Sequence, residues 1–326
     1  MTERSYGIGG YYPEGALSKR AENALALSSE RAFSDAAANG AVLESQCLMC
    51  DCATMTLTVA LPDGIVGTIR KDEVCYSPSP SAEVKDIAVI TRVGKPIQFK
   101  VLSIDGKNAL LSRRSAQKEC SENYISSLSP GDIIPARVTH LEPFGAFCDI
   151  GCGIVSLLTV DRISVSRISH PSDRFRQGEY ISAIVASRED DGRLYLTHRE
   201  LLGTWEENAA RFSAGQTVTG IVRSVETYGV FVELAPNLAG LAEETAGVEP
   251  GDLCSVYIKS IIPDRMKIKL IIIDVCGKAT PSPVEYFTDT ERVWHIDSWQ
   301  YSPDCSQKHI GTDFSGAESL RKATNG

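Results

Sequence analysis

Four aromatic residues, in two copies of one short motif, are the residues in this sequence best suited to a chemical role. The copies are Phe144–Phe147 and Tyr228–Phe231, and 84 residues separate both the first rings and the second rings. Each copy runs into an alternating stretch, in which successive side chains of a strand point to opposite faces. The second ring shares its face with Asp149 or Glu233. Because a carboxylate rarely points into a core, we predict that the rings face solvent. Two exposed rings form a platform on which nucleic-acid bases stack, at roughly 1–3 kcal/mol per base.

The cysteines offer a different chemistry, because thiolates suit tetrahedral zinc sites. Cys47, Cys50 and Cys52 are closely spaced, and Cys75 is the nearest candidate for a fourth ligand. A second Cys/His pair at ligand spacing is not evident in the sequence. We therefore favour the alternative, small apolar residues on a strand and its turn, and predict no metal and no cofactor. The sequence contains no His-Glu-x-x-His, P-loop or Gly-x-Ser-x-Gly motif, and we predict that the protein is not an enzyme.

The composition limits the kind of nucleic acid that the chain can bind. There are 33 basic and 42 acidic residues, a formal charge of −9, which argues against a simple electrostatic binder. Stacking and local basic patches would have to supply the affinity, which favours single strands over duplexes. The ten cysteines are scattered, the chain opens without a basic-then-apolar segment, and no apolar run reaches the roughly 20 residues of a membrane span. We expect a cytoplasmic protein with reduced thiols and no membrane contact.

The platforms need a β scaffold, and the repeat defines it. The segment 94–101 matches 178–185, again 84 residues apart, and short alternating strands with turn residues between them predict small barrels. We predict a mainly β fold of three tandem five-stranded barrels joined by short helices, with Trp205 anchoring the second linker. The predicted parts are a partly helical N-terminal arm (1–41), a degenerate barrel (42–118), a linker (119–130), a barrel with an insertion at 161–171 (131–199), a helical linker (200–214), a third barrel (215–275) and an irregular C-terminal extension (276–326).

These motifs resemble the S1 RNA-binding domain, an oligonucleotide-binding (OB-fold) barrel. Its pattern opens with Gly-x-x-x-x-Gly/Ala-x-Val, which the segments 131–138 and 215–222 match. It continues with aromatic-Gly-x-Phe-Val-Asp/Glu-Leu, which both ring motifs resemble, and closes with Asp-x-x-x-Gly-Arg-Ile-x-Leu-Ser, which 190–197 resembles. The resemblance covers 131–275 strongly and 42–118 weakly. The arrangement is similar to the shorter S1-like ribosomal proteins of low-GC Gram-positive bacteria.

The resemblance implies an RNA face made of the two aromatics, a histidine after the third strand, and an acidic/basic pair near the last turn. The histidine is missing, because Thr159 and Glu243 occupy its positions. His170, within the insertion, could substitute for it, and its alternative is a histidine that caps a loop. The full predicted RNA-binding set is Phe144, Phe147, Arg137, His170, Arg174 and Arg193, with Glu189 or Asp190 as the acid, in the second repeat, and Tyr228, Phe231, Asp264 and Lys267 in the third.

Our first functional hypothesis is therefore an RNA-binding protein of the ribosomal protein S1 type. It would hold single-stranded mRNA in translation by base stacking and phosphate contacts, while the degenerate first repeat docks on the small ribosomal subunit. The alternative is a protein–protein scaffold in an RNA-decay or transcription complex with weak RNA binding, which the acidic balance and the missing histidine favour. A third class is a metal protein built on the cysteines of the first repeat.

Overall fold

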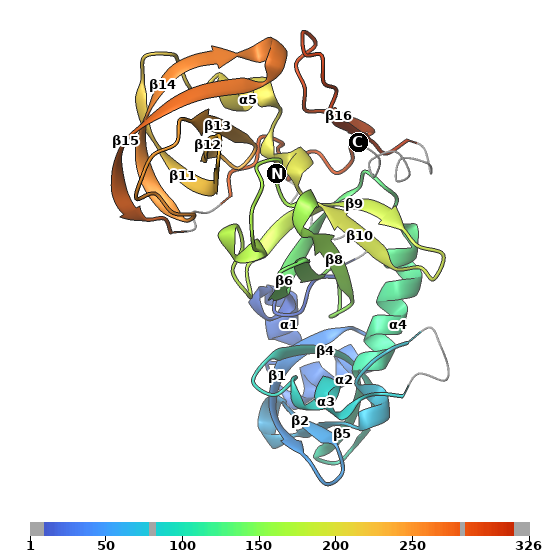
Figure 1. The fold of residues 1–326 in the computed structure, drawn as a ribbon. Coiled ribbons are helices and arrows are strands. Elements are labelled where there is room, and N and C mark those ends of the chain that lie inside the picture. The colour runs from blue at the N-terminus through green and yellow to red at the C-terminus, as the bar shows by residue number, and fades with distance from the viewer. Residues whose placement is uncertain (1–9, 78–82, 281–283, 316–326) are drawn as a thin grey trace. The chain divides into compact units, whose positions relative to one another are not determined.

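The computed structural model describes residues 10–77, 83–280 and 284–315 and contains three closed five-stranded barrels (Figure 1). The mainly β architecture of tandem five-stranded barrels is therefore confirmed. The strands of the first barrel are β1 (Leu43–Asp51), β2 (Thr56–Ala60), β3 (Val66–Ile69), β4 (Pro96–Asp105) and β5 (Asn108–Ser112). Those of the second are β6 (Ile133–Glu142), β7 (Gly145–Asp149), β8 (Val155–Thr159), β9 (Tyr180–Arg188) and β10 (Leu194–Thr197). Those of the third are β11 (Thr217–Glu226), β12 (Gly229–Ala235), β13 (Leu238–Ala242), β14 (Asp252–Ile262) and β15 (Lys267–Lys278).

All three barrels share one strand order. In the first barrel the order is β1-β2-β3-β5-β4, with the third and fifth strands parallel and the other pairs antiparallel, and the third barrel repeats it. The second barrel has the matching order β6-β7-β8-β10-β9. This closed five-stranded order is that of the OB-fold. Alternation supplies the cores: in the third barrel Val222, Val230 and Val232 point inward and are fully buried.

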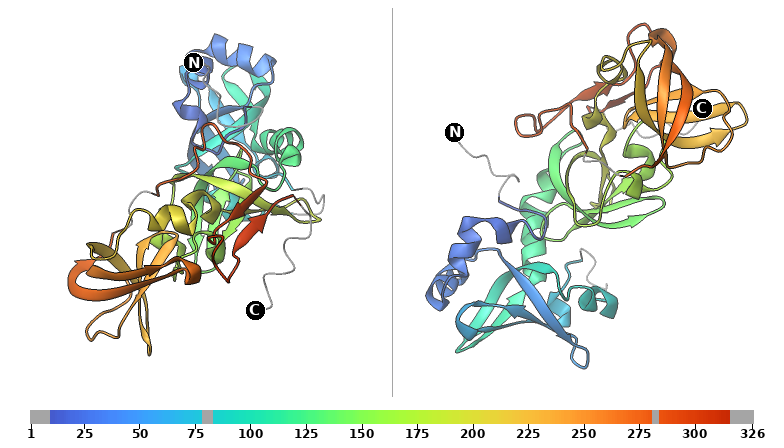
Figure 2. Two further views of the ribbon diagram at one scale, coloured as in Figure 1. Left: turned by 90° about the horizontal axis from the view of Figure 1, so that it is seen from above. Right: turned by 90° about the vertical axis from the view of Figure 1, so that its left-hand side faces the viewer.

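The N-terminal segment differs from the predicted arm. It forms η1 (Leu17–Lys19), α1 (Ala21–Ala26) and α2 (Glu30–Ala38), and residues 1–9 lie outside the described part. The helices are separate because Ser29 caps α2: its side chain accepts a hydrogen bond from the amide of Ala32. Phe33 of α2 is fully buried within the core of the first barrel. These helices are therefore part of the first barrel, alongside which they lie (Figure 2).

Short helices occupy the connections. The principal ones are α4 (Arg113–Asn123), which starts earlier than the predicted linker because Ser112 caps it, and α5 (Trp205–Ala209). Trp205 is buried in the core of the third barrel, as predicted for a packing anchor. The remaining short helices are η2 (Pro62–Gly64), η3 (Lys71–Glu73), α3 (Asp86–Ile90), η4 (Ile125–Ser127), η5 (Val160–Arg162), η6 (Pro171–Asp173), η7 (Arg199–Leu202) and η8 (Pro263–Arg265).

The described part of the C-terminal extension contains a hairpin of β16 (Ser298–Gln300) and β17 (Gly311–Asp313), visible in Figure 2. Tyr301 beside this hairpin is buried against the third barrel, and its hydroxyl donates to the carbonyl of Asn237 at 2.5 Å. Residues 316–326 of the predicted extension lie outside the described part.

The chain divides into two compact units. The first comprises residues up to 128 together with 135–137 and 149–155, and the second comprises the remainder, including both ring motifs. None of the helices in the described part of the chain is long and apolar enough to cross a membrane.

Candidate nucleic-acid interface

The two rings of the second barrel lie at the start of β7. Phe144 is 55% exposed and Phe147 is half-buried, and their centroids are 5.9 Å apart with the planes at 89°. Gly145 makes this arrangement possible, because a Cβ there would lie 2.5 Å from the carbonyl oxygen of Leu158 on the neighbouring strand. The strands therefore approach closely at this point, and Phe144 lies at the edge of the barrel, where a planar ligand can reach its face.

The third barrel repeats this geometry at β12. Tyr228 is 66% exposed, and its ring centroid lies 6.1 Å from that of Phe231, with the planes at 88°. Gly229 has a φ of +145°, and a Cβ there would lie 2.3 Å from the carbonyl oxygen of Ala242. Only glycine fits so close an approach, so the same backbone requirement positions both pairs of rings.

Our reason for placing these rings outward was wrong, although the rings do lie on the outer side. Asp149 and Glu233 were expected to share a solvent-facing side with Phe147 and Phe231, yet their exposed fractions are only 1% and 5%. Both carboxylates point out of their own barrels and are covered by other segments. Burial of this kind cannot be read from alternation, because alternation distinguishes two faces and does not say what covers each.

Asp149 is covered within the first unit. Its carboxylate accepts hydrogen bonds from the amides of Glu14 (2.7 Å), Gly151 (2.9 Å) and Gly153 (3.0 Å). Burial, and then the nearby charge of Glu14, raise the pKa of Asp149 to about 7, an effect that these donors only partly offset. Burial also acts against ionisation of Glu14, but the charge and hydrogen bonds of Arg113 (2.6 and 3.0 Å) outweigh it and lower the pKa of Glu14.

Glu233 is covered within the second unit, and this corrects the assignment of Arg174 to RNA phosphates. Arg174 is buried and donates to Glu233 through Nη2, so its guanidinium already binds an internal carboxylate. Arg223 binds the same carboxylate through Nε (2.8 Å) and Nη2 (3.1 Å) and lies 3.6 Å from Asp173. Glu233 is thus an anion between two guanidinium groups, and it joins the segment before β9 to the strand that carries Phe231.

The other predicted residues of the second repeat lie in different environments. His170 caps η6: its Nδ1 accepts from the amide of Ser172 at 3.1 Å, which is the loop-capping role weighed against RNA contact. Arg137 is half-buried and donates to the carbonyl of Glu14 at 3.0 Å. Arg193 has a side chain 78% exposed, with Asp191 2.8 Å away, and it remains accessible to a phosphate.

In the third repeat the predicted pair is exposed. Asp264 lies in η8, 3.8 Å from Arg265, and Lys267 opens β15. Both therefore lie at the turn where the resemblance placed an acidic/basic pair. Whether they contact RNA stays a prediction.

Two residues on the same faces were missed by the sequence reasoning. His140 of β6 has a side chain 60% exposed, and its ring lies 6.4 Å from that of Phe147 with the planes at 26°. Its Nε2 is 2.7 Å from Glu142. Lys269 of β15 is exposed and pairs in register with Leu241, which in turn pairs with Phe231. Alternation does place Lys269 outward, between the buried Ile268 and Leu270. His140 lies two residues after the buried Val138, so alternation would place it inward, and only the structure shows that it is exposed. The sequence reasoning also expected a histidine only after the third strand.

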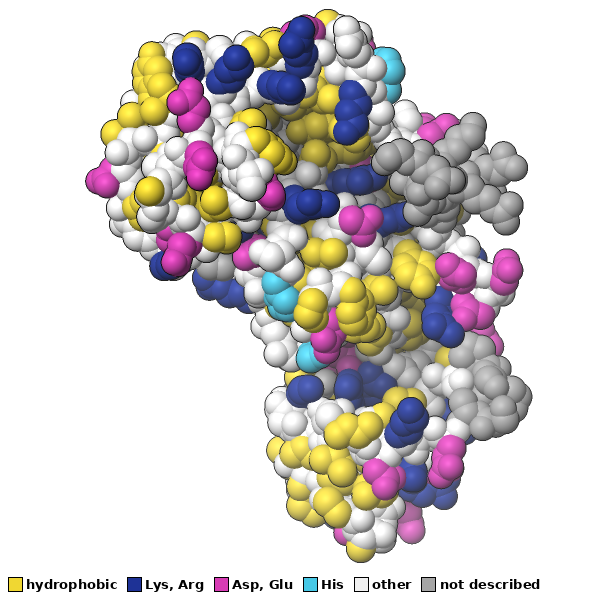
Figure 3. All heavy atoms as spheres, in the orientation of Figure 1, with side chains coloured by type: hydrophobic (Ala, Val, Ile, Leu, Met, Phe, Trp, Pro, Cys, Tyr) yellow, Lys and Arg dark blue, Asp and Glu magenta, His cyan; other side chains and the backbone are white. Residues whose placement is uncertain are grey.

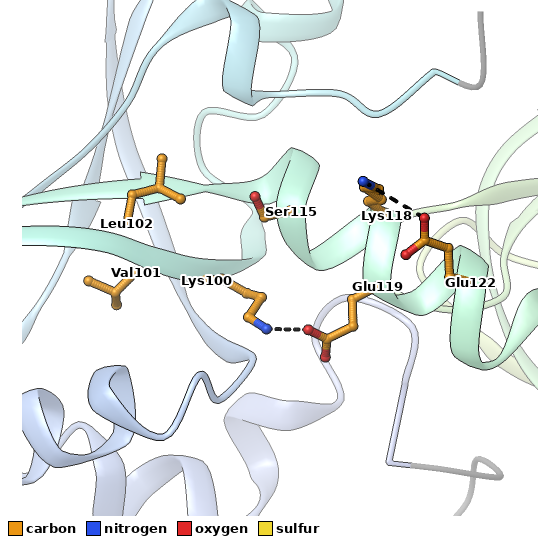
Figure 4. Close-up of a pocket in the computed structure, with 7 residues that line it drawn as sticks. All are labelled: Lys100, Val101, Leu102, Ser115, Lys118, Glu119 and Glu122. Carbon is orange, nitrogen blue, oxygen red and sulfur yellow. Dashed lines mark hydrogen bonds and ion pairs between the residues drawn. The ribbon is translucent and has the colours of Figure 1, made fainter.

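The first barrel lacks rings on the corresponding face. Thr58 of β2 occupies the place of Phe231, since it pairs with Met49 on one side and Thr68 on the other. A hollow between β4 and α4, shown in Figure 4, contains two internal ion pairs, Lys100 with Glu119 and Lys118 with Glu122. These pairs already use its charges, and none of the predicted site residues lines it.

The cysteines of the first barrel do not form a metal cluster in the described part of the chain. No group of three or more Cys, His, Asp or Glu side chains is arranged there to hold a metal ion. Cys47 is fully buried in the barrel core, and burial raises the pKa of its thiol to about 11.

Comparison with known proteins confirms the resemblance to ribosomal protein S1. Small ribosomal subunit protein bS1 of Leuconostoc lactis is 31% identical over 195 residues, which cover 54% of this chain and 45% of the relative. The bS1 homolog of Bacillus cereus is 27% identical over 242 residues, covering 70% and 61%. The bS1 of Staphylococcus haemolyticus is 31% identical over 208 residues, covering 58% and 52%. The chain spans about half the length of the curated relatives it matches. No family model matches the sequence.

Solved structures with similarity include a multidomain protein with nucleic acid binding domains from Streptococcus pneumoniae. It is 13% identical, covers 72% of this chain and 74% of its own, and has a TM-score of 0.23. GSP13 from Bacillus subtilis is 18% identical and covers 22% of this chain and 57% of its own, with a TM-score of 0.22.

Proposed function

We propose that this protein binds single-stranded RNA in translation, in the manner of ribosomal protein S1. The observation that carries the proposal is the repeated pair of exposed rings. Phe144 with Phe147 and Tyr228 with Phe231 have nearly the same separation and angle in two barrels, and in each pair the residue after the first ring makes a strand contact that only glycine permits. Two rings at right angles offer one face for stacking and one edge for a second base. The relatives named small ribosomal subunit protein bS1 support the setting in translation.

The test is binding of a fluorescent single-stranded RNA of about a dozen nucleotides, a length within the range of OB-fold sites. The double variant Phe144→Ala, Phe147→Ala should weaken binding by a few kcal/mol, because at least one stacked base loses its partner. Phe144 is exposed and Phe147 half-buried, so the barrel should keep its fold, which circular dichroism checks. Normal RNA binding by the folded double variant would refute the stacking platform.

A matched control distinguishes stacking from general loss of apolar surface. Val155 is 51% exposed on β8 of the same barrel and belongs to neither ring pair. Val155→Ala should leave RNA affinity unchanged within about twofold. If it weakened binding as much as loss of the rings, the site would be an extended apolar surface and the rings would have no special part in it.

We further propose that the first barrel contacts the small ribosomal subunit. Its ring-free face carries exposed apolar side chains, with Leu48 at 55% and Met49 at 56% exposure. Such a surface suits a protein partner better than bases, which stack on rings. Cosedimentation of the full chain with small subunits tests the idea: Met49→Glu should reduce it without affecting RNA affinity, and unchanged cosedimentation would refute this docking face.

A further inference from the structure

The outer faces of the second and third barrels carry side chains of different chemistry at matching positions. In the third barrel a row of paired residues crosses the sheet in register, from Ser224 through Phe231 and Leu241 to Lys269. In the second barrel Leu157, which is placed against Gly145 as Leu241 is against Gly229, pairs with Tyr195. Tyr195 therefore stands where the third barrel has Lys269.

The beginning of the row differs as well. His140 lies beside Phe147 in the second barrel, whereas Ser224 pairs with Phe231 in the third. The second barrel thus places three ring side chains, those of His140, Phe147 and Tyr195, where the third places a hydroxyl, one ring and an ammonium group. The second row favours flat uncharged partners and the third row favours a partner with negative charge.

The net charges of the corresponding hairpins support the same difference between the two barrels. Residues 187–195, which join β9 to β10, contain two arginines and three acids, a net charge of −1. Residues 260–269, which join β14 to β15, contain Asp264, Arg265, Lys267 and Lys269, a net charge of +2. Lys and Arg side chains gather over the upper part of the third barrel, around the β14–β15 hairpin (Figure 3). This concentration occurs in a chain whose net charge is −9.

Three of these cations have no acidic partner. We call Lys259, Lys267 and Lys269 the lysine strip: all three are exposed, and within the described residues none of their ammonium groups forms an ion pair or a hydrogen bond. The acids on the neighbouring strands, Glu226 at the end of β11 and Glu243 just after β13, are exposed, and within the described residues neither forms an ion pair with the lysine strip. In the second barrel, by contrast, Arg193 is held by Asp191 at 2.8 Å.

The three unpaired ammonium groups of the lysine strip leave positive charge without an internal counterion. That arrangement costs self-repulsion in the free protein, and an external polyanion relieves it by releasing its own condensed counterions on binding. The backbone of a nucleic acid next to Phe231 supplies such an anion at regular spacing. Free lysines therefore make a stronger case for phosphate contact than the paired arginine of the second barrel.

We propose that the two barrels make unlike parts of the RNA contact: the second stacks bases on His140, Phe144 and Phe147, and the lysine strip of the third binds backbone phosphates. This division of labour rests on the RNA-binding function proposed above. It predicts that most of the salt dependence of binding comes from the third barrel, and that most of the base-dependent affinity comes from the second.

The experiment measures RNA affinity of the full chain by fluorescence anisotropy over a series of salt concentrations. Each phosphate contact on a single strand contributes about 0.7 to the slope of log affinity against log salt, so removing the lysine strip should lower the slope by about 2. The variant is Lys259→Gln, Lys267→Gln, Lys269→Gln. Between 50 and 200 mM salt, the wild-type chain should lose about 20-fold more affinity than this variant.

A charge-matched control removes three exposed lysines of the first unit: Lys85→Gln, Lys107→Gln, Lys118→Gln. This control has the same net charge as the lysine-strip variant and should keep the wild-type slope. The Phe144→Ala, Phe147→Ala variant should lose affinity at every salt concentration and also keep the slope. An abasic ribose-phosphate oligomer should keep the dependence on the lysine strip and show no dependence on these two rings.

The outcomes separate this inference from the proposed function. A slope that the lysine-strip variant leaves unchanged, or lowers no more than the control does, overturns the division of labour while RNA binding itself stands. Loss of binding to the abasic oligomer by the Phe144→Ala, Phe147→Ala variant also overturns it, because the rings would then bind something other than bases. Failure of the unaltered chain to bind RNA removes both proposals.

Discussion

Glu233 of β12 allows the sharpest test of how the second and third barrels are held together. It lies 5% exposed between Arg174 and Arg223, and the contacts are unequal. Arg223 donates two hydrogen bonds to it, whereas Arg174 donates one and keeps a buried Nε without a partner among the described residues. Burial accordingly lowers the pKa of Arg174. The carboxylate is therefore the essential member and Arg174 the dispensable one.

The expected magnitudes follow from this asymmetry. Glu233→Gln leaves the buried guanidinium of Arg174 without its anion and that of Arg223 with only Asp173, and should lower the free energy of unfolding by about 3–5 kcal/mol. Arg174→Met leaves Glu233 paired with Arg223, removes a poorly satisfied buried charge, and should change that free energy by less than about 1.5 kcal/mol in either direction. With a urea m-value near 2 kcal/mol/M, the midpoint should fall by about 1.5–2.5 M for Glu233→Gln and by less than about 0.8 M for Arg174→Met.

Tryptophan fluorescence reports on the relevant part of the chain. All three tryptophans, Trp205, Trp294 and Trp299, lie in the second unit, so urea unfolding followed by their emission measures that unit alone. Equal destabilisation by the two variants would refute the asymmetry. RNA affinity of Arg174→Met should stay within about twofold of wild type, since the side chain is buried. A tenfold loss with unchanged stability would mean that Arg174 contacts RNA after all.

Two further predictions concern Asp149 and His140. Burial raises the pKa of Asp149 to about 7 in the folded state, whereas an unfolded aspartate has a pKa near 4. Protonation of this carboxyl therefore stabilises the folded state, and the stabilisation is complete below about pH 4. It is lost as the pH rises to about 7, by up to about 1.4 kcal/mol per pH unit. In the wild-type protein, hydrogen exchange of peptides covering 10–16 and 149–155 should therefore speed up between pH 5 and 7 by more than the intrinsic rate does. The Asp149→Asn variant should not show this extra increase. The same increase in the wild type and the variant would contradict the prediction. His140→Ala should weaken RNA binding about fivefold, because it removes a ring beside Phe147. Ser224→Ala, at the matching position of the third barrel, should have no effect on RNA binding. Equal effects of the two variants would exclude a special part for His140.

The sequence alone determined the repeat and the barrel type, and it predicted the outward side of the rings, although the carboxylates used in that argument are buried. A period of 84 residues, glycines at the starts of β7 and β12, and alternation along single strands are local properties, and the backbone geometry of a strand follows from them. The buried anchor Trp205 was also predictable, because a large aromatic in a polar linker has few other places to go.

Only the tertiary structure decided which outward side chains stay in water. Asp149 and Glu233 have the same alternation and yet are buried, because distant segments carrying Glu14 and Arg174 pack over them. For the same reason Arg174 is an internal counterion and His170 a helix cap, while His140 and Lys269 are free to meet a ligand. Alternation fixes the direction of a side chain within one strand, but the exposure of that side chain depends on which other segments of the chain cover it. The contacts that cover Asp149 and Glu233 join residues 135 and 59 positions apart in the sequence.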